Sequence, residues 1–459
     1  MTHLQVTRMT VHSQLTRLGL FDARVPRYTS YPTAPHFGET VNPALFVDWI
    51  RAVPAGSEIS LYLHVPFCRR LCWFCACRTQ GTSSEEPVRA YAQTLKAEIT
   101  ILKRNLAPGI TLSRLHWGGG TPTLLTPDLM RDLAETVFEA VPMGEGAEFS
   151  VEIDPCEIDE ARLDALVAAG MNRASIGVQD FDPKIQAVIG REQSYGVTKQ
   201  AVDMIRARGV QSLNADILYG LPHQDTATIT RSVEQLLTLT PDRVALYGYA
   251  HVPWMARRQV MIPSEHLPTP QERLALFETA RDLFVAAGHV EIGIDHFALP
   301  TDGLARAQTA GTLKRNFQGY TDDQAEVLIG LGASSISKFP QGYAQNNPAT
   351  GAYTGAIQDR AFATARGHRF SDDDKLRARL IEALMCDFRI DRAEILMGFC
   401  VAATELDKML SAVAEQFAGA VALTAQGLEI PPHARALTRV IARAFDAYDL
   451  SKAGHSSAI

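Results

Sequence analysis

From about residue 58, short apolar runs bounded by glycine, proline or aspartate alternate with longer segments of helical periodicity. This alternation is typical of βαβ units and predicts a parallel sheet. The runs recur at roughly 25 to 50 residues, near the spacing expected when each strand is followed by a crossover helix. The expected strands are Ser60–Phe67, Ser113–Gly118, Glu148–Asp154, Arg173–Gln179, Ser212–Tyr219 and Arg243–Ala250.

The segments between these runs carry apolar residues at steps of three or four, which indicates helices with one buried face. The stripe over Val88–Leu106 is an example. Thr126 followed by Pro127 predicts an N-cap with proline at the first helical position. Thr269 with Glu272 predicts a capping box at the start of a later helix.

Six strand–helix units are too few for a complete eight-stranded barrel, so the pattern predicts an α/β fold with a partial (β/α)6, TIM-like barrel. Functional residues are then expected at the C-terminal ends of the strands. A seventh run, Val290–His296, is expected to extend the sheet. We expect three regions: an irregular, proline-containing N-terminal arm (1–55), the barrel domain (56–371) and a mainly helical C-terminal domain (372–459).

Composition and charge limit the class of partner. The chain is 46% hydrophobic and 21% charged, as expected for a globular protein, and its formal net charge is −7. This acidity argues against a nucleic-acid partner, because cations to neutralise phosphates are not in excess. No run approaches the roughly 18 apolar residues of a membrane span, and no secretory signal is evident at the N-terminus. We therefore expect a cytoplasmic protein with a small-molecule partner and no membrane association.

Four of the seven cysteines lie close together, at Cys68, Cys72, Cys75 and Cys77. Such a group leaves three alternatives open: a structural zinc site, an iron–sulfur cluster or a reactive thiol pair. The C-x₃-C-x₂-C run favours the cluster, because structural zinc sites usually use paired C-x₂-C units separated by an interval. A cubane held by three thiolates leaves one iron free to bind a ligand.

Polar residues and glycines follow several of the expected strands. Residues 118–121 form a glycine-rich turn after the second strand, where the backbone can approach a ligand and expose its N–H groups. Glu152, Gln179 and Asp216 lie at the ends of three further strands, with Arg191 nearby in sequence. Each taken alone fits an internal ion-pair layer equally well. Their shared placement at strand ends favours a ligand site.

The cysteine spacing, with Phe74 before the third cysteine, resembles the motif of the radical S-adenosylmethionine (radical SAM) superfamily, and GGGTP resembles its GGE-type motif. A more specific resemblance covers the chain from about residue 27 to the C-terminal domain. RYTSYPTA, LYLHVPFC, the fourth cysteine, HWGGGTPT, VEIDP, GVQDF, DILYGLP, YAHVP, IDHFA and NFQGYT are similar to the oxygen-independent coproporphyrinogen III oxidases.

This resemblance implies a radical SAM barrel in which Cys68, Cys72 and Cys75 hold a 4Fe-4S cluster, with the arm contributing to the active site. Cys77, Arg191 and Glu152 are expected to be catalytic, Cys77 as a nearby thiol and not as a cluster ligand. The implied contacts of the cosubstrate S-adenosyl-L-methionine are Tyr62, Phe74, Ala76, Gly119, Gly120, Thr121, Glu152, Gln179, Arg191, Asp216, Ala250 and Ile336.

The implied reaction belongs to haem (porphyrin) biosynthesis. A 5′-deoxyadenosyl radical removes hydrogen from a propionate β-carbon of coproporphyrinogen III, and loss of CO₂ and one electron leaves a vinyl group. Two such events yield protoporphyrinogen IX, so the chain would be an oxidoreductase, a coproporphyrinogen dehydrogenase. We expect a monomer supplied by a reductant such as flavodoxin or ferredoxin. The alternatives are a haem-binding, chaperone-like radical SAM paralogue and, more distantly, a non-catalytic zinc-binding protein.

A substrate with four carboxylates requires local cations. The candidates at motif loops are Arg69, Arg70, Arg257, Arg258 and Arg315. Two positions depart from the family pattern. Ala76 stands where glycine is frequent and fits only if its φ is negative. Leu299 stands where a basic residue is common and removes one expected carboxylate partner.

Overall fold

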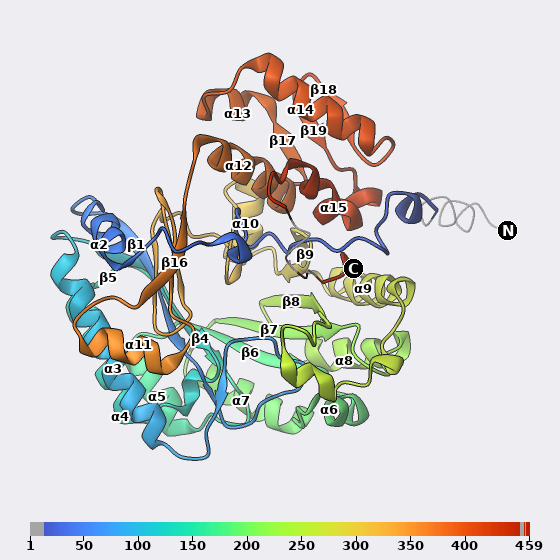
Figure 1. The fold of residues 1–459 in the computed structure, drawn as a ribbon. Coiled ribbons are helices and arrows are strands. Elements are labelled where there is room, and N and C mark those ends of the chain that lie inside the picture. Colours follow the sequence, from blue (N-terminus) through green and yellow to red (C-terminus); the bar gives the residue numbers. More distant parts are fainter. Residues whose placement is uncertain (1–12, 450–453, 455) are drawn as a thin grey trace.

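The computed structural model describes residues 13–449, 454 and 456–459, so residues 1–12 of the predicted arm lie outside the described residues. All six predicted strands are present, and they pair in parallel in the middle of a 12-stranded sheet (Figure 1). These strands are β1 (Glu58–Val65), β4 (Thr111–Gly119), β5 (Met143–Ile153), β6 (Arg173–Gln179), β7 (Ser212–Tyr219) and β8 (Arg243–Gly248).

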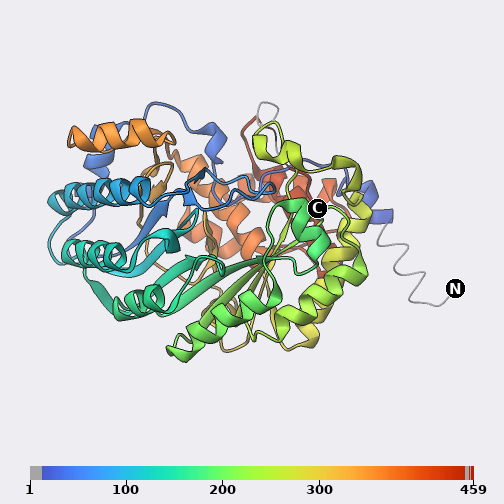
Figure 2. The same cartoon turned by 90° about the horizontal axis from the view of Figure 1, so that it is seen from below.

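Helices follow these strands and cover the outer side of the curved sheet (Figure 2). The expected caps are present: the Thr126 side chain accepts from Leu129 N, and Thr269 and Glu272 form a capping box. The helices of this layer are α3 (Glu86–Asn105), α4 (Pro127–Ala140), α5 (Glu160–Ala168), α6 (Pro183–Ile189), α7 (Tyr195–Ala207), α8 (Thr226–Leu237) and α9 (Pro270–Ala286).

Both edges of the sheet are antiparallel, which the sequence pattern did not indicate. Beside β1 lie β13 (Leu328–Leu331), which pairs in parallel, and then β14 (Ile336–Phe339), β15 (Gly342–Asn346) and β16 (Thr364–Arg369), each antiparallel to its neighbour. The predicted seventh strand extends the sheet, but as two antiparallel strands, β9 (Val290–Ile292) and β10 (His296–Ala298). The run is broken at Gly293, whose φ of 55° reverses the chain.

Shorter elements complete the barrel region. Among them are the two-residue strands β2 (Phe67–Cys68) and β3 (Gln80–Gly81), which bracket most of the cysteine loop and pair in parallel. The others are β11 (Lys314–Asn316), β12 (Gly319–Thr321), α10 (Gly303–Ala310) and α11 (Thr350–Gln358).

The C-terminal region is mainly helical, as predicted, but it also contains a small three-stranded sheet. Its helices are α12 (Asp372–Asp387), α13 (Arg392–Gly398), α14 (Ala403–Gln416) and α15 (Thr438–Ala442), and its strands are β17 (Arg389–Asp391), β18 (Ala422–Thr424) and β19 (Gly427–Glu429). Strands of three residues are too short to show a period of two, so the sequence pattern did not reveal them.

The N-terminal arm is not wholly irregular, because it contains helix α2 (Pro43–Arg51), capped by the Asn42 side chain. The arm runs between the barrel and the C-terminal region (Figure 1). Leu15, Leu20 and Tyr28 of the arm belong to the same buried cluster as the C-terminal helices, whereas a separate large core lies between the barrel sheet and the helices that cover it. The boundaries predicted for the three regions remain predictions. In the described part of the chain, no helix combines the length and apolar character of a membrane span.

Candidate active site

The cysteine loop begins where β1 ends, at the C-terminal end of the parallel strands. Cys68 is in β2, and Cys72 and Cys75 lie in a turn in which Cys75 N donates to Cys72 O (3.3 Å). The main chain at Trp73 donates to Ile189 O (2.9 Å), which anchors the loop to α6. Among the described residues, no three His, Cys, Asp or Glu side chains lie close enough together to hold one metal ion.

Hydrogen-bond donors point at the sulfur atoms of this loop. Arg191 Nη1 donates to Cys72 Sγ (3.6 Å), and Cys77 N donates to Cys75 Sγ (3.4 Å). The hydrogen bond from the Cys77 thiol is the largest influence on Cys75, and it lowers the pKa of Cys75 to about 6 despite burial. Donors and nearby cations stabilise a thiolate, which is the form that ligates a metal.

Arg191 joins the cysteine loop to two strands. Besides Cys72, its guanidinium donates to Gly177 O (2.8 Å) at the end of β6 and lies 3.7 Å from a carboxylate oxygen of Asp154, just beyond β5. Its Nε is buried without a hydrogen-bond partner among the described residues. Arg191 therefore retains a donor for a further acceptor in the site.

The glycine turn after β4 packs so closely that side chains are excluded. Gly120 N donates to Val65 O (2.8 Å), and Thr121 N donates to Phe67 O (2.7 Å). A Cβ at Gly120 would lie 2.5 Å from Phe67 O. Gly119 has a φ of 112°, and a Cβ there would meet the His64 ring at 2.5 Å. The turn thus brings β4 against the beginning of the cysteine loop.

Glu152, on β5, faces the interior of the barrel. It accepts from Gly119 N (3.0 Å) and lies 3.3 Å from His116 Nε2. Burial raises the pKa of Glu152, but the hydrogen bond and charge of His116 and the Gly119 N–H outweigh it, so the pKa stays below its ordinary value. Its side chain is 42% exposed to the space inside the barrel, so an ionised carboxylate is available to a ligand there.

Asp216 and Gln179 occupy neighbouring strands. Burial raises the pKa of Asp216 to about 6, although Asn214 Nδ2 donates to its carboxylate (2.8 Å). Gln179 lies at a register shift between β6 and β7 and has a φ of 68°, which is unusual for a residue with a side chain. Such backbone conformations persist where the surrounding structure imposes them, often at functional sites.

A cavity of about 670 Å³ lies inside the barrel, next to these residues. The predicted site residues that line it are Tyr62, Ala76, Cys77, Gly119, Glu152, Asp216 and Ile336. Ala76 is not among the residues with positive φ, so alanine fits its backbone conformation. The structure thus brings together seven of the predicted residues from six separate segments of the chain.

The other predicted residues lie around this cavity without lining it. Gln259 Nε2 donates to both Phe74 O (2.7 Å) and Ala250 O (3.0 Å), so one amide holds these two segments together. Gly120, Thr121, Gln179 and Arg191 lie at the turns described above, behind the cavity wall.

Sequence reasoning missed several titratable side chains of the cavity. His64 and His116 project into it from β1 and β4, and Tyr247 and His296 do so from β8 and β10. Tyr62 Oη lies 2.9 Å from His64 Nδ1. The sequence of β1 contains a pattern from which His64 could have been predicted. Ser60, Tyr62 and His64 alternate with apolar residues, which places their polar side chains on the inner face of the sheet.

None of the five arginines predicted for substrate carboxylates lines this cavity. Arg69 pairs with Glu157 (3.8 Å), Arg258 Nη2 donates to Thr79 Oγ1 (2.9 Å), and Arg315 lies 3.6 Å from Asp295. Leu299 does not line it either. Arg78, Arg114 and Arg173 do, and the last two are already paired with Glu148 at 2.8 and 3.1 Å.

Tyr28 and Tyr31 of the arm contact the C-terminal region. Tyr28 Oη donates to Asp446 Oδ2 (2.9 Å), and Ala447 N donates to Tyr31 Oη (3.0 Å). Arg27, beside them, reaches the barrel and donates to Gly248 O (2.6 Å). The arm therefore touches both regions.

Comparison with known proteins places this arrangement in a family. The Radical SAM superfamily profile matches residues 62–236, which include the cysteine loop and Glu152. The oxygen-independent coproporphyrinogen III oxidase of Paracoccus denitrificans is 68% identical over 451 residues, covering 98% of this chain and 100% of that protein. The chain belongs to the oxygen-independent coproporphyrinogen III oxidase family.

More distant members of this family agree along nearly the whole chain. The Escherichia coli enzyme of the same description is 37% identical over 432 residues, covering 93% of this chain and 94% of that protein. The crystal structure of coproporphyrinogen III oxidase from Escherichia coli, described as a radical SAM enzyme, superposes with a TM-score of 0.87 at 35% identity. It covers 93% of this chain and 100% of that chain, so the arm, barrel and C-terminal region are shared family features.

Proposed function

We propose that this chain catalyses the oxygen-independent oxidative decarboxylation of two propionate side chains of coproporphyrinogen III, giving protoporphyrinogen IX in haem biosynthesis. One observation carries the proposal. In a chain of this family, a cavity of about 670 Å³ lies at the C-terminal strand ends, and seven residues expected in the site line it beside the cysteine loop. Enclosure suits radical chemistry, because water and competing reactions are kept away.

The cysteine loop has the features needed to hold a 4Fe-4S cluster. Cys68, Cys72 and Cys75 would be the ligands, since Arg191 and the Cys77 N–H already donate to two of the three sulfur atoms. When bound, the cluster supplies the electron that cleaves S-adenosyl-L-methionine and so begins the radical chemistry. Cys77 would remain a thiol, placed at the cavity wall to donate to Cys75.

The cosubstrate would be held by groups of both charges. Glu152, kept ionised by His116 and Gly119 N, suits the amino group, and Arg191, with an unused buried N–H, suits an anionic or carbonyl acceptor. Asp216 suits a hydroxyl group, which a carboxyl can bind in either protonation state. The further proposed contacts are Tyr62, Phe74, Ala76, Gly119, Gly120, Thr121, Gln179, Ala250 and Ile336.

Within this proposal, Cys77, Arg191 and Glu152 are the catalytic side chains. The protein would act as a cytoplasmic monomer that receives electrons from a small redox protein such as flavodoxin or ferredoxin. The reaction also needs an acceptor for the electron left after CO₂ departs. In this proposal, residues 56–371 carry out catalysis, and residues 1–55 and 372–459 close the site.

The experiment is an anaerobic assay of reconstituted protein with a reductant, S-adenosylmethionine and coproporphyrinogen III. We expect protoporphyrinogen IX from the wild type and none from Cys68→Ala. Cys400→Ala is the matched control, because this exposed cysteine lies outside the loop and its loss should leave activity unchanged. Activity that persists in Cys68→Ala, or a purified protein that binds zinc and no iron, would overturn the proposal.

A further inference from the structure

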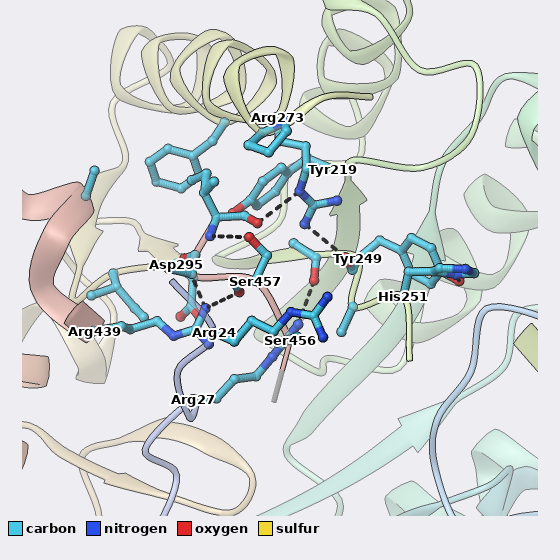
Figure 3. Close-up of a pocket in the computed structure, with 18 of the residues that line it drawn as sticks. Arg24, Arg27, Tyr219, Tyr249, His251, Arg273, Asp295, Arg439, Ser456 and Ser457 are labelled. Carbon is cyan, nitrogen blue, oxygen red and sulfur yellow. Dashed lines mark hydrogen bonds between the residues drawn. The ribbon is translucent and has the colours of Figure 1, made fainter. Parts of the chain in front are cut away.

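A second cavity, of about 240 Å³, lies at the barrel rim beside the ends of β7 and β8 (Figure 3). Besides these strand ends, its walls include the N-terminal arm, the first turns of α9, helix α15 and residues 456–459. The last of these pair with the arm, where Ala458 N donates to Ala23 O (2.8 Å). Tyr219 and Trp254 give the cavity aromatic surface.

Five arginines line this cavity. Arg435 is paired with Glu291 (3.9 Å), and the other four are Arg24 and Arg27 from the arm, Arg273 from α9 and Arg439 from α15 (Figure 3). Arg27, Arg273 and Arg439 donate to main-chain oxygen atoms, and the oxygen on Ile459 belongs to the carboxylate of the last residue. Arg273 donates to the oxygens of Ile459, Gly220 and Tyr249 (3.0, 3.2 and 2.9 Å), and Arg27 donates to that of Gly248 (2.6 Å). Arg439 donates to the oxygens of Val25, Pro26, Ser457 and Ala458 (2.6 to 3.3 Å).

The cavity has an excess of positive charge. No ion pair within 4.0 Å joins any of the four guanidinium groups to an Asp or Glu of the described residues. Asp295 is the one acidic side chain in the lining, and it is already held by His296 (2.7 Å) and Arg315 (3.6 Å). The carboxylate of Ile459, the last residue, also lines the cavity and is bound by Arg273 (3.0 Å). Burial, and repulsion by Arg27, lower the pKa of Arg439 to about 9, because together they outweigh the opposing charge of Asp295.

Arg27, Arg273 and Arg439 are half-buried, and cations that are removed from water and repel one another are stabilised when an anion binds between them. Guanidinium groups bind carboxylates in a planar, bidentate manner, so several converging arginines favour a carboxylate ligand. Arg273 and Arg439 are held in place by their hydrogen bonds to main-chain oxygens, and Arg27, with a single such bond, keeps more of its donors for a ligand.

The cavity also adjoins the active site. Gly248 and Asp295, which line it, are the sequence neighbours of Tyr247 and His296, which line the large barrel cavity. Ala250 belongs to its wall and is joined to Phe74 of the cysteine loop through Gln259. A large ligand in the barrel could therefore place a side arm between the arginines.

We propose that Arg24, Arg27, Arg273 and Arg439 form a carboxylate site at the barrel rim that binds propionate groups of the tetrapyrrole substrate not undergoing reaction. The identification of the bound ligand as the tetrapyrrole substrate rests on the proposed function. The site determines which molecules bind productively, because a tetrapyrrole without these carboxylates leaves the arginines unpaired.

The test measures binding separately from catalysis. Coproporphyrin III, the stable oxidised tetracarboxylate, is titrated into anaerobically reconstituted protein and followed by its fluorescence. We expect Arg27→Gln and Arg273→Gln to raise its Kd about ten-fold or more, as for a lost charge-assisted contact. Arg27→Lys should recover part of the loss. The control is Arg131→Gln on α4, far from the rim, whose side chain is 54% exposed. Added S-adenosylmethionine should change the cluster spectrum equally in all variants.

Arg27→Gln is decisive, since Arg27 makes a single hydrogen bond here and its loss spares the fold. An unchanged Kd in folded Arg27→Gln would overturn the inference, as would glutarate binding as tightly as coproporphyrin III, which indicates a general small-anion site. Weaker porphyrin binding in Arg27→Gln, in protein that forms no protoporphyrinogen IX, would count against the proposed function alone. Normal turnover with unaltered binding would count against the inference alone.

Discussion

Glu98, on α3, is a buried carboxyl that fixes one wall of the active site. It is 0% exposed and accepts from Gly332 N, Asn346 Nδ2 and Tyr353 Oη, each at 2.7 Å. The segment that begins at Gly332 leads into β14, where Ile336 lines the cavity. Burial raises the pKa of Glu98 from 4.5 to about 7, because the three donors do not fully replace water.

This pKa predicts a pH-dependent stability. Between pH 4.5 and about 7 the folded protein holds the Glu98 proton and the unfolded chain does not, so stability falls as the pH rises. The fall attributable to Glu98 is at most on the order of 3 kcal/mol. We expect Glu98→Gln to flatten the dependence of the urea midpoint on pH between 5 and 8. The exposed Glu135→Gln, on α4, should retain the wild-type slope, and a wild-type slope in Glu98→Gln would refute the assignment.

Among single residues, the sequence was sufficient to predict candidates that are recognised by their place along a strand. Glu152, Gln179 and Asp216 were predicted because each lies towards the end of an expected strand, and the ends of parallel strands meet at one edge. In the structure, Glu152 and Asp216 line the barrel cavity. The rim arginines were not found, because Arg439 and the arm residue Pro26 are 413 positions apart in the chain. Convergence over such a distance depends on the packing of the arm, which no local pattern records.

Helix α9 begins with a capping box that also positions a rim arginine. Thr269 Oγ1 accepts from Glu272 N (3.3 Å), Glu272 Oε2 accepts from Thr269 N (2.7 Å), and Arg273 follows in the first turn. We expect Thr269→Ala to lower the free energy of unfolding by about 1 kcal/mol, since a helix N–H loses its acceptor. Thr279→Ala, in the same helix, is the control. Its hydroxyl bonds only the Ala275 carbonyl (2.7 Å), so the change should be within about 0.5 kcal/mol. Equal urea midpoints for the two variants would show that the cap contributes nothing.

Helices of several turns and strands that are buried along their length were predicted well. Short strands at the edges of the sheets were not. β1 and β7 are buried along nearly their whole length, which gave continuous apolar runs bounded by turn residues. By contrast, β9, β10 and β17 have three residues each, so neither length nor alternation distinguishes them from loops. Their pairing is determined by the neighbouring strand and not by their own composition.

At the scale of the whole molecule, the arm contacts both the barrel and the C-terminal region and holds them together. Tyr28 and Tyr31 bind the C-terminal segment at Asp446 and Ala447, while Arg27 binds the barrel at Gly248. The arm, α9 and α15 all line the rim cavity, so these contacts contribute to its shape. Substrate access and arm docking are therefore expected to be linked, since opening the arm separates the arginines.

We expect the double variant Tyr28→Phe, Tyr31→Phe to weaken the contact between the arm and the C-terminal region without unfolding the barrel. Each lost hydrogen bond is worth about 1 kcal/mol, so amide hydrogen exchange over residues 23–31 and 446–448 should accelerate about ten- to thirty-fold. Exchange in α3 and α4, which pack on the far side of the sheet, should not change. The control is Tyr195→Phe, which removes a hydroxyl 2.6 Å from Thr238 Oγ1, away from the arm. Unaltered exchange in the arm of the double variant would mean that apolar packing alone, through Leu15 and Leu20, keeps it in place.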